Sequence, residues 1–132
     1  MSLAIALTKG RLEKKTIELL EKRGYGIEKL KDKGRQLVFQ DSKKDVCYFL
    51  VKANDCITYV EHGVADIGVV GKDTLMEGGS DYYEMMDLGF GKCKFIVGGL
   101  KDKNPLLKTG HVKIGTKYPN VAQQYFQRKG MD

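Results

Sequence analysis

The chain has 132 residues, of which 42% are hydrophobic and 30% charged, and a net charge of +6, a composition typical of one soluble globular domain with a modest core. Apolar segments recur along the whole sequence, which argues against disorder, and no apolar run approaches the roughly 20 residues of a membrane helix. Because residues 1–3 lead directly into a strand-like segment, without a basic region and a long apolar stretch, we expect no secretion signal and a cytoplasmic location.

The first 35 residues predict a strand, a helix and a loop. Residues 3–7 form a continuous apolar run, as expected for a strand buried on both faces, and Thr8-Lys9-Gly10 interrupts it. From Arg11 onward, apolar residues recur at helical spacing until Gly24, a typical residue at the C-terminus of a helix. Residues 28–35 are mostly charged and are expected to form a loop.

The rest of the sequence continues the alternation of strands and helices. Segments rich in β-branched, aromatic or other apolar residues predict strands at residues 36–40, 46–51, 66–71, 93–97 and 112–115. Periodicity and terminal signals, such as Asn54 as an N-cap, predict helices at residues 54–62, 73–77 and 120–129. A surface turn is expected at residues 78–80 and a polar loop at residues 101–111. This order is typical of an α/β protein with a mainly parallel sheet.

Charge is unevenly distributed along the chain. Residues 1–50 carry 12 Lys and Arg against 7 Asp and Glu (+5), residues 51–91 carry 2 against 8 (−6), and residues 92–132 carry 9 against 2 (+7). Two basic segments that flank an acidic one favour anionic partners such as nucleotides, phosphates or nucleic acid. Solvated lysines that bind nothing are the alternative interpretation.

The cysteines and histidines suggest no metal or redox centre. Cys47, Cys56 and Cys93 are widely spaced, and an odd number without a Cys-x-x-Cys pair argues against a disulfide framework or a zinc site. We expect buried or half-buried thiols. His62 and His111 are isolated from each other in the sequence, which does not favour metal ligation.

A basic turn, Thr8-Lys9-Gly10-Arg11, joins the first predicted strand to the first predicted helix. Ligands of parallel α/β folds bind at this carboxyl edge of the sheet, where a helix N-terminus supplies free N–H groups and partial positive charge. Gly10 allows the backbone to approach a ligand closely, Lys9 supplies a point charge, and Arg11 can bind phosphate through two parallel hydrogen bonds. The turn suggests a phosphate site, and a basic turn that contacts only water is the alternative.

Two further turns contain comparable residues. Val70-Gly71-Lys72-Asp73-Thr74 joins a predicted buried strand to a helix, and its hydroxyl and N–H groups suit a phosphate or a ribose hydroxyl. Asp73 or Thr74 could instead simply cap the helix. Gly89-Phe90-Gly91-Lys92-Cys93 could frame an anion or could be a plain loop that enters a strand. No histidine-based triad accompanies Cys93, so we predict no cysteine nucleophile.

Four motifs in order together cover nearly the whole chain: Ala6-Leu7-Thr8-Lys9-Gly10-Arg11-Leu12, Tyr59-Val60-Glu61-His62-Gly63-Val64-Ala65-Asp66-Ile67-Gly68-Val69-Val70-Gly71-Lys72-Asp73, Asp87-Leu88-Gly89-Phe90-Gly91-Lys92-Cys93 and Gly115-Thr116-Lys117-Tyr118-Pro119-Asn120. Taken together they resemble the ATP phosphoribosyltransferase family, and residues 59–63 resemble its short form. Thr8 and Ala53 stand where the family often has proline, which changes the stiffness of a loop rather than its charge.

The resemblance implies a fold like that of type II periplasmic binding proteins, with two α/β lobes whose sheets are mainly parallel. Residues 1–92 would form the first lobe of the catalytic domain, and residues 93–132 would begin a second lobe that is incomplete in this chain. The family's phosphoribosyl-pyrophosphate loop, of the type acidic residue-Thr-Gly-Thr, does not occur in the sequence. The chain is therefore expected to be the N-terminal portion of the enzyme and to be inactive by itself.

The activity that the resemblance implies is a pentosyl transfer, the first step of histidine biosynthesis. Adenine N1 of ATP attacks C1′ of phosphoribosyl pyrophosphate, and pyrophosphate leaves together with Mg²⁺, which is expected to be bound with the substrate phosphates. No catalytic residue, general base or protein metal ligand is identified. The expected substrate-binding residues are Lys9, Gly10, Arg11, Lys52, Gly71, Lys72, Asp73, Thr74, Lys92 and Lys117.

The short form implies an oligomeric assembly with a separate regulatory subunit related to histidyl-tRNA synthetase, and neither nucleic acid nor membrane as a partner. One alternative is a non-catalytic module of the same two-lobed fold that binds a small anion or a nucleotide, because fold does not determine function. A transport protein of that kind should carry a secretion or lipid-anchor signal. Another alternative is a nucleic-acid-binding protein, which the basic charge favours but which lacks a recognition motif here.

Overall fold

The chain forms two compact units in the computed structural model, which describes residues 2–32, 34–78, 82–107 and 110–131. The first unit is Met1–Gly91 and the second is Lys92–Asp132. The surface turn expected at residues 78–80 lies largely outside the described residues, since these include only Gly78 of that turn.

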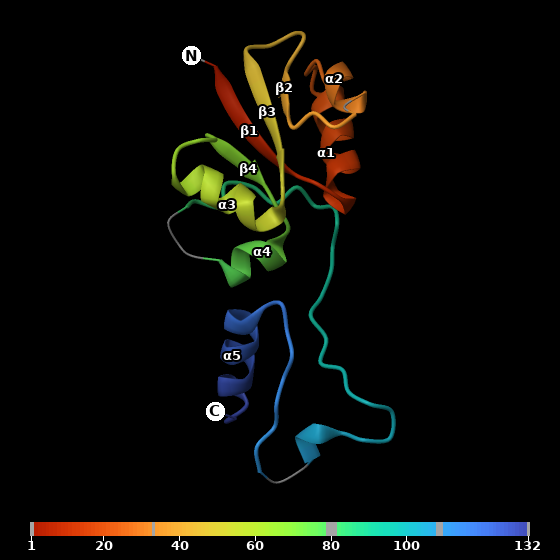
Figure 1. The fold of residues 1–132 in the computed structure, drawn as a ribbon, viewed down its shortest axis with the longest axis vertical. Coiled ribbons are helices and arrows are strands. Elements are labelled where there is room, and N and C mark those ends of the chain that lie inside the picture. The colour runs from red at the N-terminus through yellow and green to blue at the C-terminus, as the bar shows by residue number, and fades with distance from the viewer. Residues whose placement is uncertain (1, 33, 79–81, 108–109, 132) are drawn as a thin grey trace. The chain divides into compact units, whose positions relative to one another are not determined.

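Strands and helices alternate along the first unit (Figure 1). Its described elements are β1 (Leu3–Thr8), α1 (Arg11–Lys22), α2 (Glu28–Lys31), β2 (Val38–Gln40), β3 (Val46–Val51), α3 (Ala53–Glu61), β4 (Ile67–Val69) and α4 (Lys72–Glu77). The strands form one sheet in the order β2-β3-β1-β4. β1 pairs in parallel with β3 and β4, and β2 pairs antiparallel with β3. The prediction of an α/β chain with a mainly parallel sheet is confirmed.

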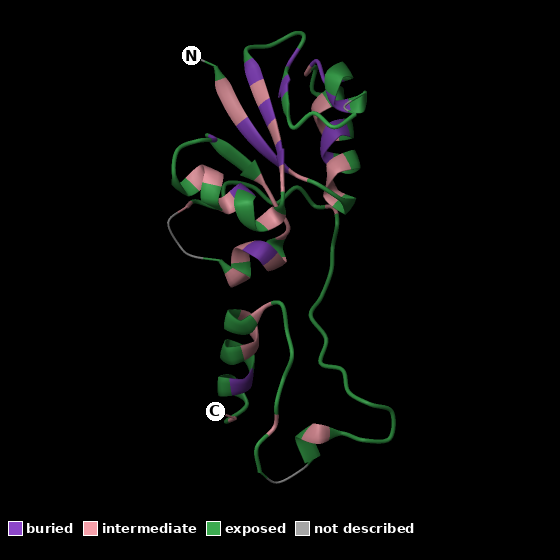
Figure 2. Cartoon of the chain, viewed as in Figure 1, coloured by how far each residue is buried: buried purple, intermediate pink, exposed green. Residues whose placement is uncertain are grey.

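The core of the first unit lies on both faces of the sheet, because successive side chains of a strand point to opposite faces. Ile5 and Leu7 of β1 belong to a cluster that includes Ile17 of α1. Ala6, between them, belongs to a second cluster with Cys56 of α3. Figure 2 shows this buried material concentrated in the central strands and in the sides of the helices that face them. α1 and α3 therefore cover opposite faces, and β1 is buried on both, as its continuous apolar run predicts.

Several local predictions for the first unit are corrected by tertiary contacts. Residues 28–35 are not entirely loop, because α2 buries Leu30 in the core, at 2% exposure. Asn54 is not an N-cap, because α3 begins one residue earlier and Lys52 occupies that position. The strand expected at residues 66–71 is shorter and is not fully buried, since β4 pairs only with β1 in the described sheet.

The second unit contains one 3-10 helix, η1 (Pro105–Leu107), and one α-helix, α5 (Pro119–Arg128), among its described residues. η1 lies within the expected loop at 101–111, of which residues 108–109 are outside the described residues. α5 confirms the helix predicted at 120–129, and Phe126 is its buried side chain. The strands predicted at 93–97 and 112–115 are absent from the described chain. Strand propensity is a preference for a half-buried pleated surface, and neither segment has a sheet partner that would provide one.

Candidate functional site

The carboxyl ends of β1 and β3 place two of the expected substrate-binding residues, Lys9 and Lys52, next to each other. Thr8, the last residue of β1, lies in register with Val51, the last residue of β3. The N–H of Lys9 donates a hydrogen bond to the Val51 carbonyl at 3.0 Å, so the two chains are still paired as they leave the sheet. The backbones of Lys9 and Lys52 are therefore neighbours at the carboxyl edge of the sheet.

The connections that follow these two strands run to opposite faces of the sheet. β1 leads into α1, which packs on one face, and β3 leads into α3, which packs on the other (Figure 1). Neighbouring parallel strands with divergent connections form the switch point at which ligands of open α/β sheets bind. The topology thus selects the edge between β1 and β3, where Lys9 and Lys52 lie.

The first turn has a backbone that suits glycine. Gly10 is the N-cap of α1, with φ 108° and ψ −139°, a conformation that residues with a side chain rarely adopt. Its N–H donates to the carboxylate of Glu13 at 3.4 Å, a long hydrogen bond at the start of the helix. Lys9 and Arg11 on either side of Gly10 are exposed. An anion that bound at this helix N-terminus would compete with the Glu13 carboxylate for the Gly10 N–H.

The second turn enters α4 at the same edge, because Val69 of β4 lies in register with Leu7 of β1. Gly71 is the N-cap of α4, and its carbonyl accepts a hydrogen bond from the Thr74 N–H at 3.1 Å. Neither Asp73 nor Thr74 is the cap, so the capping alternative for these side chains is wrong.

The side chain of Leu12 lies beside two glycine turns from distant parts of the sequence. A Cβ placed on Gly91 would lie 2.4 Å from Leu12 Cδ2, and one on Gly71 would lie 3.9 Å from Leu12 Cδ1. The Gly89-Phe90-Gly91 segment therefore closes against the first turn of α1. Sequence reasoning did not select Leu12, although its place on the apolar face of α1 is the signal that would have found it.

Lys72 forms an ion pair with Glu84, a residue that the sequence analysis also missed. Both side chains are partly exposed, at 60% and 42%. Tyr82, two residues before Glu84, donates a hydrogen bond from its hydroxyl to the Leu75 carbonyl of α4 at 2.8 Å. No sequence pattern marks Glu84, because its partner lies 12 residues away in the chain.

Lys92 and Lys117 belong to the second unit and are exposed. The ammonium of Lys117 lies 5.9 Å from the centre of the Tyr118 ring, within that unit. The structure brings together Lys9, Gly10, Arg11, Lys52 and the turn at 71–74 in the first unit, and the expected roles of Lys92 and Lys117 stay predictions.

The thiols differ from one another in environment. Cys56 is fully buried, its Sγ lies 3.4 Å from the Ala6 carbonyl oxygen, and burial raises its pKa to about 11. Cys47 is half-buried, as expected, but Cys93 is exposed, which corrects the expectation for that residue. The segment that contains Cys93 is not a strand and has no sheet to cover it. A protonated, enclosed thiol such as Cys56 serves packing and not chemistry.

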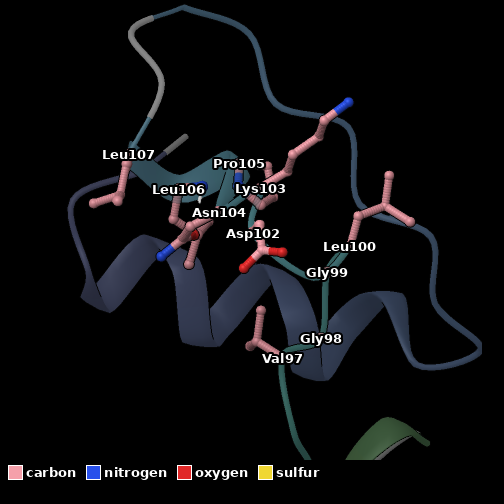
Figure 3. A pocket seen from close by; sticks show the side chains of 10 residues that line it. All are labelled: Val97, Gly98, Gly99, Leu100, Asp102, Lys103, Asn104, Pro105, Leu106 and Leu107. Carbon is pink, nitrogen blue, oxygen red and sulfur yellow. Dashed lines mark hydrogen bonds between the residues drawn. The ribbon is translucent and has the colours of Figure 1, made fainter.

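A pocket of about 440 Å³ lies in the second unit, between residues 97 and 107. Figure 3 shows it framed by the backbone of Gly98 and Gly99, the side chain of Val97, and the turn that carries Asp102 to Leu107. None of the residues expected to bind substrate lines it.

In the described residues, no three His, Cys, Asp or Glu side chains are grouped in a way that could hold a metal ion. Among these described residues, no helix is long and apolar enough to cross a bilayer.

Comparison with known proteins gives the same family as the motifs. A family model described as "HisG: ATP phosphoribosyltransferase" matches residues 52–132. A Clostridium kluyveri protein named ATP phosphoribosyltransferase is 52% identical over 128 residues, which is 97% of this chain and 58% of that protein. A Bacillus mycoides protein of the same name is 57% identical over 132 residues, covering 99% of this chain and 62% of that protein.

A solved structure is also similar to this chain. It is the ATP phosphoribosyl transferase (HisG:HisZ) complex from Thermotoga maritima, with a TM-score of 0.67 and 33% sequence identity. The match covers 98% of this chain and 60% of that chain. The chain thus spans about three fifths of the length of the proteins that it matches.

Proposed function

The chain belongs to the ATP phosphoribosyltransferase family, and from that premise we propose that it supplies part of the substrate site of such an enzyme. The reaction is the first step of histidine biosynthesis: N1 of adenine bonds to C1′ of phosphoribosyl pyrophosphate as the C1′–O bond to pyrophosphate breaks. The bonding electron pair of that C1′–O bond leaves with pyrophosphate. The observation that carries the proposal is the meeting of the Lys9-Gly10-Arg11 turn, Lys52 and the turn at 71–74 at one carboxyl edge.

The residues of this edge would act mainly by binding and orientation. Exposed Lys9 and Arg11 would contact substrate phosphates, and Arg11 would do so through two hydrogen bonds. Lys52 would face the same ligand from the start of α3. Positive charges held near a departing pyrophosphate stabilise the negative charge that develops there, and oriented reactants need no covalent intermediate. A general base is not assigned.

The remaining expected ligand contacts are extensions of the same proposal. Gly71, Lys72, Asp73 and Thr74 would border the ligand from the turn into α4, while Lys92 and Lys117 would approach it from the second unit.

For the whole protein we propose two α/β lobes arranged as in type II periplasmic binding proteins. Residues 1–92 would be the first lobe and residues 93–132 the beginning of the second. We also propose an oligomeric assembly with a regulatory subunit, in keeping with the HisG:HisZ complex described for the Thermotoga maritima protein.

Magnesium would enter this site bound to substrate phosphates, where it supplies charge neutralisation for the leaving group. Mg²⁺ in phosphate-transfer sites is commonly held by one or two carboxylates together with the phosphates. Within the turn at 71–74, the carboxylate that would share such an ion is that of Asp73, whose Oδ1 lies beside Gly71 at the start of α4.

Arg11→Ala in the full-length protein tests the proposed site. We expect binding of ATP or of phosphoribosyl pyrophosphate to weaken by about 1.5–3 kcal/mol, the range for a hydrogen bond to a charged group. Titration calorimetry with each substrate measures the change. Arg23→Ala is the matched control, because Arg23 lies at the opposite end of α1, roughly 18 Å away along the helix. Unchanged affinity for both substrates would exclude the role of Arg11.

Pyrophosphate release, measured with both substrates and Mg²⁺, tests the activity itself. Turnover by the full-length protein supports an enzyme, whereas binding of ATP without turnover in the presence of a cognate regulatory subunit would favour the non-catalytic alternative. The 132-residue chain assayed alone is expected to release no pyrophosphate, because the acidic residue-Thr-Gly-Thr loop does not occur within it.

A further inference from the structure

Lys72 differs from the other cations of the carboxyl edge because it forms an ion pair with a carboxylate, that of Glu84. The ion pairs that the described residues show are Lys31–Glu21, away from this edge, and Lys72–Glu84, at it. Lys72 is the first residue of α4, directly after the glycine turn that lies next to the β1 edge. A carboxylate on Lys72 occupies the position that an anionic ligand of this lysine would take.

Glu84 is held in place by the segment that carries it. Tyr82 is anchored to the Leu75 carbonyl by its hydroxyl, and Glu84 contacts Lys72. Both contacts are to α4, one to the side chain of its first residue and one to the backbone carbonyl of Leu75, three residues later. Two contacts thus attach one short segment to this helix, which reduces the entropy that Glu84 loses when it pairs with Lys72.

The environment of Tyr82 agrees with this arrangement. Partial burial raises the pKa of the Tyr82 hydroxyl, the negative charges of Glu61 and Glu84 raise it further, and Lys72 acts in the opposite direction. The hydroxyl is therefore protonated across the physiological range, and its hydrogen bond to the Leu75 carbonyl persists there. The anchor that positions Glu84 does not titrate near neutral pH.

We propose that Glu84 is an internal counter-ion that competes with substrate phosphates for Lys72. The proposal rests on the proposed function, because it assumes that Lys72 contacts an anionic ligand. Binding of that ligand would separate the ammonium of Lys72 from Glu84 and leave the carboxylate to water. Glu84 would thereby lower the affinity of the edge for free anions and favour ligands that gain enough contacts elsewhere to displace it.

Glu84→Gln is the direct test, carried out in the full-length protein with inorganic pyrophosphate and ATP as separate probes. Gln keeps the size of the side chain and removes its charge, so Lys72 is released. Because exposed ion pairs contribute about 0.2–1 kcal/mol, we expect affinity for each probe to increase by a factor of about 1.4 to 5. Glu21→Gln is the matched control, since it removes the same charge from the Lys31–Glu21 pair, whose exposure of 54% and 52% is similar. No change in affinity is expected for that control.

A double-mutant cycle separates competition for Lys72 from a general effect of charge. In a Lys72→Met background, Glu84→Gln should no longer increase affinity, because the lysine that it releases is absent. An increase of the same size in that background would overturn the proposal, as would unchanged or weaker binding by Glu84→Gln alone. If the unmodified protein binds neither probe, the proposed function itself fails. The failure of the counter-ion and the failure of the site are therefore distinguishable.

Discussion

Residues 1–91 contain the fully buried side chains of Leu7, Phe39 and Tyr48, whereas among the described residues of 92–132 only Phe126 is a buried hydrophobic residue. The two units differ only modestly in their supply of apolar residues, which number 40 of 91 in the first and 15 of 41 in the second. The second unit has large hydrophobic side chains that are exposed by more than a third, namely Phe95, Ile96, Val97, Leu100, Leu106, Leu107, Ile114 and Tyr125. Figure 2 shows the contrast between a first unit with buried strands and a second that is mostly exposed.

The comparison teaches that partners, and not composition, decide whether an apolar segment becomes a strand. Apart from Lys94, residues 93–97 resemble Val46–Val51 in their aliphatic, aromatic and cysteine residues. The first lies between β1 and β2 and forms β3, while the second has no strand assignment. A strand needs neighbours for its backbone N–H and C=O groups and a layer to cover its face.

The largest effect that we expect is on the core of the first unit. Leu7 is 1% exposed, so Leu7→Ala removes buried apolar atoms, leaves a cavity and should cost about 2–5 kcal/mol of unfolding free energy. Leu100 in the second unit is 76% exposed, and Leu100→Ala should change the same quantity by less than about 0.5 kcal/mol. Urea unfolding followed by circular dichroism measures both. A comparable loss for Leu100→Ala would break the contrast, since it would reveal a core in the second unit.

A buried carboxylate in the first unit provides the next test. Asp41 is 5% exposed and accepts hydrogen bonds from the backbone N–H groups of Gly26, Lys43 and Lys44, at 2.7–2.9 Å, and from the Tyr48 hydroxyl at 2.5 Å. Asp41→Asn places an amide N–H₂ group among hydrogen-bond donors. We expect this substitution to lower the free energy of unfolding by about 1–3 kcal/mol, the penalty for unsatisfied buried groups. Asp45→Asn in the same hairpin is the control, because that residue is exposed, and it should be nearly neutral.

The same residue predicts an acid dependence of stability. Burial raises the pKa of Asp41, but the hydrogen bonds from Tyr48 and the three backbone N–H groups outweigh it, so that the pKa is lowered overall. A lowered pKa stabilises the folded protein above the unfolded-state value of about 3.9, and this contribution is lost as the pH falls below it towards the folded-state value. Unfolding midpoints between pH 3 and pH 6 should therefore decrease less steeply in Asp41→Asn. An identical acid dependence in the variant would show that Asp41 does not contribute.

The smallest effect on stability, and the sharpest difference between the units, concerns the thiols. Exposed Cys93 should react rapidly with iodoacetamide at pH 8, whereas Cys56 should react only after unfolding, because it is buried and its pKa is raised to about 11. Mass spectrometry of the labelled peptides measures the two rates. Cys93→Ser should remove the fast reaction, while the free energy of unfolding stays within about 0.5 kcal/mol of that of the unmodified protein. A fast reaction that survives in Cys93→Ser would show that another thiol is accessible.

Much of the first unit could be predicted locally, because its sequence signals agree with its packing. The apolar run of β1, the glycine after α1 and the β-branched residues of β3 each indicated the correct type of element. α2 could not be predicted, because its four residues are charged except for Leu30, and burial of that side chain in the core is what stabilises the turn of helix. The start of α3 was misplaced by one residue because Asn54 carries a capping preference that the backbone did not use.

The sequence by itself determined the family motifs, the alternation of strand and helix, the basic turn Lys9-Gly10-Arg11 and the glycine turn at 71–74, because each depends on residues that are neighbours in the chain. Tertiary structure decided which of these turns meet. Pairing of β1 with both β3 and β4 brings them to one edge, Leu12 joins the Gly71 and Gly91 turns, and Glu84 reaches Lys72. Such contacts depend on strand order and on the path of the chain between elements, and local preferences contain no information about either.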